Sequence, residues 1–144
     1  MMENKRFFPK YDKLFHFIWI PTAIIMLFLL VMNVFLPSAF GWIVTLATTA
    51  VVAYFVISPM FGYVELRETC VFVKFGFFMK RVIPYETIRG VEKKRTAIAD
   101  SMVALKNAME HVNIKHGSFD VTSVSVKDGD AMMAEIRKRC GIPE

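Results

Sequence analysis

One long apolar stretch dominates the first half of the chain. Between Leu14 and Val64 there is no Asp, Glu, Lys or Arg. Two segments of this stretch, 14–36 and 39–60, are each long enough to cross about 30 Å of hydrocarbon as a helix that rises about 1.5 Å per residue. Helices and closed barrels are the structures that satisfy their backbone hydrogen bonds in lipid. The pattern therefore predicts a transmembrane helical hairpin over residues 14–62.

The basic residues around this hairpin indicate its orientation. Lys and Arg are absent from its turn and frequent on both flanks, at Lys5, Arg6, Lys10, Lys13, Arg67, Lys74, Lys80 and Arg81. An excess of these residues marks the cytoplasmic side of a membrane. We therefore expect a multi-pass protein of a bacterial cytoplasmic (inner) membrane, with residues 1–13 as a basic N-terminus and both termini in the cytoplasm. A cleaved signal peptide is less favoured, because a second apolar segment follows the first at once.

Small side chains recur at every fourth position of the second apolar segment. They are Gly41, Thr45, Thr49 and Ala53, and this spacing places them on one face of a helix. Small residues let two helix backbones approach closely in a membrane. This face is expected either to pack on the first helix or to mediate dimerisation, and the sequence leaves both alternatives open.

From Tyr63 onward the pattern changes to short runs that predict a cytoplasmic domain over 63–144. In segment 69–75, Val71, Val73 and Phe75 fall on one face of a strand. Further strands are predicted at 77–85, 87–94, 110–116 and 119–126, with turns at Gly76 and Gly117. Segment 96–109 fits a short helix or a long loop between strands.

The end of the chain has the pattern of an amphipathic helix. Its apolar stripe comprises Met132, Met133, Ile136 and Cys140, after a cap at Asp128 or Asp130 and before a stop at Gly141. In the preceding strand the apolar phase shifts between Val121 and Val124, which predicts a bulge or bend. Antiparallel strands followed by one helix predict an α+β fold, a small curved sheet or barrel closed by that helix.

The densest basic feature of this domain is a set of six residues, which we call the basic cluster: Lys80, Arg81, Arg89, Lys93, Lys94 and Arg95. The cluster could contact anionic headgroups, each nearby charge contributing about 1 kcal/mol, or a partner protein. The alternative is an ordinary solvated surface of mixed charge, which the small net charge of the domain favours.

The sequence offers little for catalysis or for a cofactor. It has no Gly-rich phosphate loop and no recognised nucleophile motif. His111 and His116 would point to opposite faces of a strand, so they make poor partners for one metal ion. Cys70 and Cys140 are unspaced and are expected to be reduced thiols. We therefore expect no enzyme, no metal, no cofactor and, without a recognition helix or aromatic-basic platform, no nucleic-acid binding.

The cytoplasmic half resembles the bacterial pleckstrin-homology-like (PH-like) domains that follow one or two membrane helices. The matching residues are Ile83-Pro84-Tyr85, Ile88, Ile114-Lys115, Gly117 and Lys127-Asp128. The resemblance covers roughly 63–141 and implies a PH-like barrel or curved sheet closed by a C-terminal helix. A related membrane-anchored branch of that family includes a protein that protects its producer from its own antimicrobial peptide.

These observations lead to one expected function and one alternative. We expect a membrane-anchored, non-enzymatic PH-like binding module at the inner face of a bacterial membrane. Its expected partners are the lipid bilayer as an integral protein, an unidentified protein and, secondarily, anionic headgroups. The alternative, implied by the resemblance, is a self-immunity or resistance protein against a membrane-active antimicrobial peptide. The sequence leaves the oligomeric state open.

Overall fold

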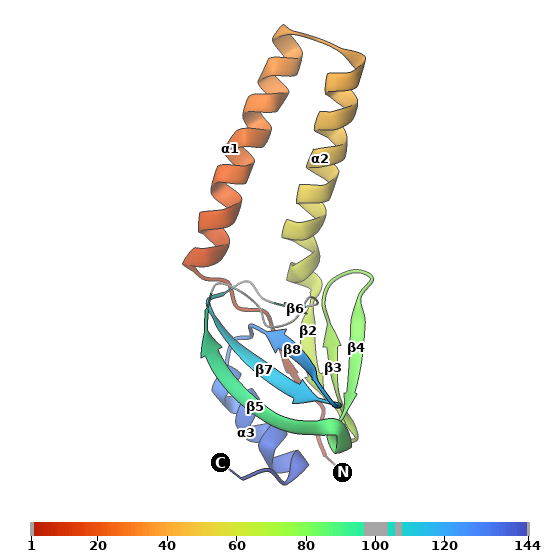
Figure 1. Cartoon of the computed structure of the whole chain (residues 1–144), viewed down its shortest axis with the longest axis vertical. Helices are drawn as coiled ribbons and strands as arrows, with labels where there is room; N and C mark the ends of the chain where they lie inside the picture. Colours follow the sequence, from red (N-terminus) through yellow and green to blue (C-terminus); the bar gives the residue numbers. More distant parts are fainter. Residues whose placement is uncertain (1, 97–103, 106–107, 144) are drawn as a thin grey trace.

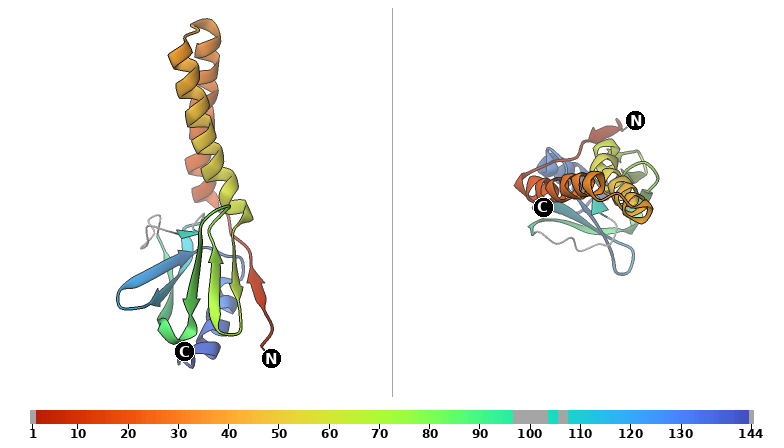
Figure 2. Two further views of the ribbon diagram at one scale, coloured as in Figure 1. Left: turned by 90° about the vertical axis from the view of Figure 1, so that its right-hand side faces the viewer. Right: turned by 90° about the horizontal axis from the view of Figure 1, so that it is seen from above.

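Two long helices rise from one end of a strand-rich domain (Figure 1). They are α1 (Lys13–Phe35) and α2 (Ala39–Ile57), and a 3-10 turn, η1 (Ser58–Phe61), continues α2. The structure is a computed structural model, and it describes residues 2–96, 104–105 and 108–143. Figure 2 shows that both helices leave the domain from the same end.

Both helices have the length and composition needed to cross a membrane. Each apolar segment, Lys13–Phe35 and Ala39–Phe61, contains 23 residues. Their apolar windows are almost entirely unburied within the protein, so they are not core helices of the domain. Asp12 caps the start of α1, and Ser38 caps α2 by accepting a hydrogen bond from the Gly41 amide at 2.9 Å.

The domain contains two four-stranded sheets. The first has the order β1-β2-β3-β4 and is antiparallel throughout. Its strands are β1 (Lys5–Phe7), β2 (Tyr63–Leu66), β3 (Cys70–Lys74) and β4 (Lys80–Pro84). A 3-10 turn, η2 (Tyr85–Thr87), leads from β4 into the second sheet.

The second sheet has the order β5-β7-β8-β6, in which only the β6 pairing is parallel. Its strands are β5 (Ile88–Arg95), β6 (Ala104–Leu105), β7 (Glu110–His116) and β8 (Asp120–Val124). The predicted order of antiparallel strands is thus confirmed. Within the described ranges the two sheets do not join into a closed barrel, which corrects the barrel alternative.

The final helix, α3 (Gly129–Cys140), packs against both sheets as the sequence predicts. Met132 and Ile136 are fully buried in the core, and Gly141 ends the helix in the left-handed conformation that favours glycine. The core that α3 covers draws on both sheets: Val64, Leu66, Val71, Val73, Phe75, Ile83, Ile88, Val91, Val112, Ile114, Val124 and Val126.

Strand β8 and segment 96–109 both belong to the region of the second sheet for which the sequence made specific predictions. A bulge or bend was expected between Val121 and Val124; the bulge is wrong, because the register of β7 with β8 is regular from Val112–Val124 to His116–Asp120. The second sheet has its register shift in the pairing of β5 with β7, between Ile88 and Gly90. Segment 96–109, predicted as helix or loop, lies mostly outside the described residues, apart from Thr96, the short strand β6 and residues 108–109.

Strand β1 is a feature that the sequence did not indicate. It precedes the helical hairpin but pairs with β2, which follows the hairpin, through Lys5–Leu66, Arg6–Glu65 and Phe7–Val64. The buried Glu65 carboxylate accepts hydrogen bonds of 2.9 Å from Arg6 and from Arg67, which together lower its pKa.

The chain after β1 is also held by the segment that follows β8 of the second sheet. Lys127 donates its amide hydrogen to the Phe8 carbonyl at 2.9 Å, and Lys10 donates to the Ser125 carbonyl at 3.0 Å. Pro9 forms a bridge with Val126. The helical hairpin is therefore inserted between two neighbouring strands of one sheet, and the domain holds the chain on both sides of it.

Candidate membrane-facing site

The connection between α2 and the domain is tightly packed. The β3–β4 loop lies beside the lower end of α2 in both side views (Figures 1 and 2). Ser58, the first residue of η1, is buried and accepts a hydrogen bond from the Phe77 amide at 3.1 Å. A side chain at Gly76 would collide with Ser58, so this approach requires glycine.

The tip of this loop is apolar and exposed. Its residues, Phe77, Phe78 and Met79, are called the aromatic loop below. The ring of Phe78 stacks on Tyr54 of α2, with centroids 6.3 Å apart and planes at 12°. Phe77 contacts Phe61 of η1 at 5.0 Å between centroids. Even so, 83% of Phe78 is exposed, so the stack covers only a small part of the ring.

Two lysines flank the aromatic loop where its strands begin and end. Lys74, the last residue of β3, is directly opposite Lys80, the first residue of β4. Neither lysine forms an ion pair with any residue that the structure describes. Like charges placed opposite each other destabilise a strand pair. An anionic group bound between the two lysines would offset that repulsion.

Helix α1 is joined to the domain through Asp12. One carboxylate oxygen accepts a hydrogen bond from the Leu14 amide at 2.8 Å and caps the helix. The other accepts from the Met109 amide, also at 2.8 Å, just before β7. Tyr11 packs edge-on against Phe15 at 4.9 Å. Each helix therefore has its own polar contact with the domain, Asp12 for α1 and Ser58 for α2.

The two helices contact each other through part of the small-residue face. Asn33 of α1 donates a hydrogen bond to the Thr45 hydroxyl at 2.6 Å, and both residues are buried. Gly41 lies so close to Asn33 that a larger side chain there would overlap it. Thr49 is exposed and Ala53 is half-buried, so the contact is concentrated toward the hairpin turn.

The structure separates the basic cluster into several environments. Lys93 forms ion pairs with Glu110 at 2.8 Å and with Asp130 at 3.0 Å, and Lys94 pairs with Glu92 at 3.4 Å. The cluster's other members lie elsewhere: Arg81 donates to Thr122, Lys80 flanks the aromatic loop, and Arg89 and Arg95 are exposed at opposite ends of β5. The six residues therefore do not form one continuous cationic surface.

A family model described as a bacterial PH domain matches residues 62–140, which run from β2 through α3. The chain belongs to the bacterial PH domain family. The match begins at the end of the hairpin, so β1 and both long helices precede the matched part of this PH domain protein. No significant match was found among curated proteins or among solved structures.

A polar group is buried between β4, β7 and β8 of the PH domain. Thr122 is fully buried, and its hydroxyl oxygen lies 2.9 Å from His116 Nε2 and accepts a hydrogen bond from Arg81 at 3.1 Å. Burial, and next the positive charge of Arg81, lower the pKa of His116. The ring is thus kept neutral and can accept the Thr122 hydroxyl hydrogen, which makes this group a structural link between the two sheets.

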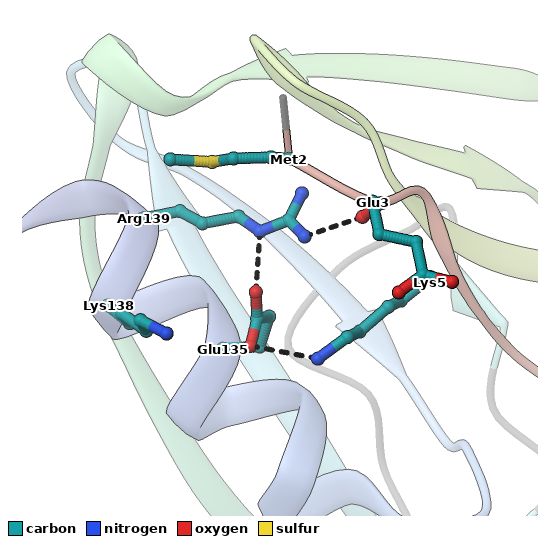
Figure 3. Close-up of a pocket in the computed structure, with 6 residues that line it drawn as sticks. All are labelled: Met2, Glu3, Lys5, Glu135, Lys138 and Arg139. Atoms are coloured by element: carbon teal, nitrogen blue, oxygen red, sulfur yellow. Dashed lines mark hydrogen bonds and ion pairs between the residues drawn. The ribbon is translucent and has the colours of Figure 1, made fainter.

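A hollow of about 250 Å³ lies at the end of the PH domain away from the helices (Figure 3). It is lined by Met2, Glu3, Lys5, Glu135, Lys138 and Arg139. The guanidinium of Arg139 is already occupied, because it donates to Glu135, to the Glu3 carbonyl, to the carbonyls of Leu66 and Arg67 and to Tyr85. These bonds fasten the N-terminal segment to α3 and β2, so the hollow is better explained as a clamp than as a ligand site.

Among the described residues, no group of three or more His, Cys, Asp or Glu side chains could hold a metal ion. Cys70 and Cys140 are free thiols, and burial raises the pKa of Cys140, which makes it a poor nucleophile. The end of the domain beside the helices therefore carries its most distinctive exposed chemistry, the aromatic loop and the two lysines next to it.

The sequence predicted some residues of this end and missed others. Lys80 was expected as part of the basic cluster, and it does flank the aromatic loop. Phe77–Met79 were expected to begin a strand, and the structure places them in the loop before β4. The available signal was three consecutive apolar residues after Gly76 in a hairpin that already had an apolar strand on each side.

Proposed function

We propose that this chain is a membrane-anchored bacterial PH module that acts by binding, without catalytic chemistry, at the inner face of the cytoplasmic membrane. The observation that carries the proposal is the insertion of the hairpin between β1 and β2. Because these strands pair in one sheet, the two domain-side ends of α1 and α2 must lie on the same side of any membrane that they cross. The hairpin then returns the chain to the side from which it started.

The distribution of charge supports the cytoplasmic side. Lys10 and Lys13 lie at the start of α1, and Lys74 and Lys80 lie beside the end of α2, whereas the turn at 36–38 carries no charge. Short basic flanks of this kind are retained on the cytoplasmic side.

The attachment also supports a binding role. Only Gly62 separates η1 from β2, and Asp12 bonds both α1 and the residue before β7. The domain is therefore held at a fixed height rather than on a flexible tether. Attachment to a surface raises the effective concentration of a nearby partner to about the millimolar range for short connections. A weak interaction surface is then sufficient.

A protein partner is favoured over a headgroup-specific lipid site in the basic cluster. Lys93 and Lys94 are locally compensated by Glu110, Asp130 and Glu92, which reduces the field that a lipid surface would experience. We expect the hairpin-free domain to bind anionic vesicles weakly and with loss of binding at high salt, because the Debye length is only about 8 Å at physiological ionic strength. Saturable, headgroup-selective binding that Arg95→Glu removes would contradict this assignment.

The membrane topology tests the proposal directly. Reporter enzymes fused before Met1 and after Glu144 should both be active only in the cytoplasm. A reporter inserted at Ser38, in the hairpin turn, should be active only on the far side of the membrane. Export of either terminus, or recovery of the protein in the soluble fraction, would refute the proposal. The self-immunity alternative stays a prediction, which sensitivity of a deletion strain to membrane-active peptides would test.

A further inference from the structure

We propose that the aromatic loop is a third point of membrane contact. Phe77, Phe78 and Met79 enter the boundary between headgroups and acyl chains, and Lys74 and Lys80 contact lipid phosphates. The loop thereby fixes the tilt of the PH domain against the bilayer. This inference rests on the proposed function, because it requires α1 and α2 to cross the membrane.

The aromatic loop lies beside the apolar span of α2, before the end of that span. The apolar span runs from Ala39 to Phe61, and Phe78 stacks on Tyr54, which lies within it. Tyr54 lies seven positions before Phe61, the end of the span, a rise of roughly 10 Å at about 1.5 Å per residue. The tip of the loop therefore reaches the depth of the last turns of the span, where the interface with water is expected.

The apolar surface is continuous from the span of α2 to the aromatic loop. Phe55 of α2 and Phe61 of η1 are more than half exposed, and Phe77 connects to both Phe61 and Tyr54 by ring contacts. Phe78 and Met79 extend this surface onto the domain. Large contiguous apolar patches of this kind mark protein or membrane contacts. Since the adjoining surface is that of the span itself, the bilayer is the occupant that fits.

Hydrogen bonds and close packing fix the aromatic loop in this position. Ser58 holds the Phe77 amide, Gly76 packs against Ser58, and the Phe75 amide donates to the Met79 carbonyl at 2.9 Å across the base of the loop. The aromatic side chains therefore cannot turn inward to hide from water without breaking the junction with η1. Their exposure is a property of the fold.

The base of the loop is basic. Lys74 and Lys80 are directly opposite each other in register next to the apolar tip, and neither has an ion-pair partner among the described residues, although Lys74 Nζ lies over the Tyr63 ring, 5.8 Å from its centroid. An aromatic tip above a pair of lysines suits the interface, where rings lie at the headgroup level and lysines reach phosphates. A phosphate between the lysines would relieve their mutual repulsion.

The test uses the full chain in vesicles that contain bromine-labelled phospholipids, which quench tryptophan on contact. In a background with Trp19→Phe and Trp42→Phe, single probes are introduced as Phe78→Trp and Phe119→Trp. Phe119 is the matched control, because it is 94% exposed but lies on the β7–β8 turn, which projects from the side of the domain below the helix ends (Figure 2). We expect several-fold stronger quenching at position 78 than at position 119.

A further probe separates the two proposals. The variant Trp19→Phe alone retains Trp42 of α2, which reports whether the hairpin is in the bilayer. Absence of quenching at Trp42 would overturn the proposed function and this inference with it. If Trp42 is quenched but positions 78 and 119 show equal, weak quenching, the membrane contact of the loop is overturned and the proposed function is not.

A second loop probe guards against local damage. If Phe78→Trp disturbed the stack on Tyr54, Met79→Trp would report the same loop from a position that has no ring partner there. Quenching at position 79 would support the inference, and its absence would overturn it. We also expect Lys74→Glu with Lys80→Glu to reduce quenching at the loop more strongly in anionic vesicles than in zwitterionic ones, because both kinds of lipid carry phosphates but only the anionic ones carry a net negative charge.

Discussion

Arg139 shows how one side chain ties the N-terminal segment to the rest of the PH domain. Only 3% of its side chain is exposed, and it donates hydrogen bonds to α3, β2, the following Arg67 and the Glu3 backbone. Nothing in its sequence neighbourhood distinguishes it from Lys138, which is exposed on the same helix and forms no bond in the hollow (Figure 3). The difference comes entirely from the direction in which each side chain leaves α3.

Replacing Arg139 should therefore be far more damaging than replacing its neighbour. Arg139→Leu leaves the Leu66 and Arg67 carbonyls and Glu135 without their charged donor, and a hydrogen bond to a charged group contributes about 1.5–3 kcal/mol. We expect the free energy of unfolding of the domain to fall by at least about 2 kcal/mol. Lys138→Leu should change it by less than about 0.5 kcal/mol. Amide hydrogen exchange of β2 in the detergent-solubilised full chain would measure the change in stability for each variant. Equal losses in the two variants would contradict the role of Arg139 as a clamp.

His116 gives a pH-dependent contribution to stability whose sign follows from its lowered pKa. The folded domain keeps the ring neutral, whereas the unfolded chain takes up a proton near the usual value of about 6.5. Stability is therefore unaffected by this group above that pH and decreases as the pH falls through it, because the unfolded state then binds more protons. The groups that affect the ring are Arg81, Arg89 and Asp120. In His116→Gln, the decrease in stability from pH 7.5 to pH 5.5 should be smaller than in the parent protein. Thermal unfolding at the two pH values measures this decrease.

At the scale of elements, the sequence predicts those whose burial follows a simple period. Strand β3 alternates buried and half-buried residues from Cys70 to Lys74, and α3 buries Met132, Met133 and Ile136 at helical spacing. Strand β8 breaks this rule because Thr122 and Ser123 are buried through hydrogen bonds to His116 and Asn113. Those buried polar residues produced the incorrect expectation of a bulge.

Other elements could not be predicted because their reasons lie far away in the sequence. Strand β1 is three residues long, and two of them are charged, so it has no apolar alternation to detect. Its position depends on Glu65, whose carboxylate accepts a hydrogen bond from the Arg6 guanidinium. The aromatic loop likewise depends on Ser58 and Tyr54 of the preceding helix. A local pattern contains neither of these partners.

The packing of α3 leads to a prediction at this scale. Ile136→Asp places a carboxylate at a fully buried position within the apolar core, where losing its hydration is costly, and should unfold the domain. The matched control is Ala134→Asp, two residues away on the exposed side of the same helix. We expect limited proteolysis of the full chain to degrade the domain of the first variant and spare that of the second. Equal resistance of both would show that α3 does not complete the core.

At the scale of the whole molecule, the domain consists of two pieces of chain that the hairpin separates. A fragment that begins near Tyr63 would lack β1, the Arg6–Glu65 pair and the Phe7 side chain that packs on the core. We expect residues 2–12, joined to 62–144 by about 15 Gly and Ser residues that span roughly 20 Å, to be more stable than 62–144 alone.

The measurement is a comparison of denaturant unfolding midpoints for the two soluble proteins. A matched control carries Arg6→Ser in the joined form, which should lose part of the gain by leaving Glu65 with Arg67 as its remaining partner. If the joined protein and the shorter fragment unfolded at the same midpoint, β1 would contribute nothing to the domain.

The insertion of the hairpin between β1 and β2 also sets the order of assembly during synthesis. Lys5 leaves the ribosome long before its partner Leu66, and closing so long a loop by chance is entropically unfavourable. If α1 and α2 cross the bilayer antiparallel, as proposed above, their domain-side ends are brought together and β1 meets β2 without a search. Completion of the sheet would then report that the hairpin has been inserted. A chain whose hairpin stalls would leave the β2 edge unpaired, and an unpaired edge can pair with another chain and aggregate.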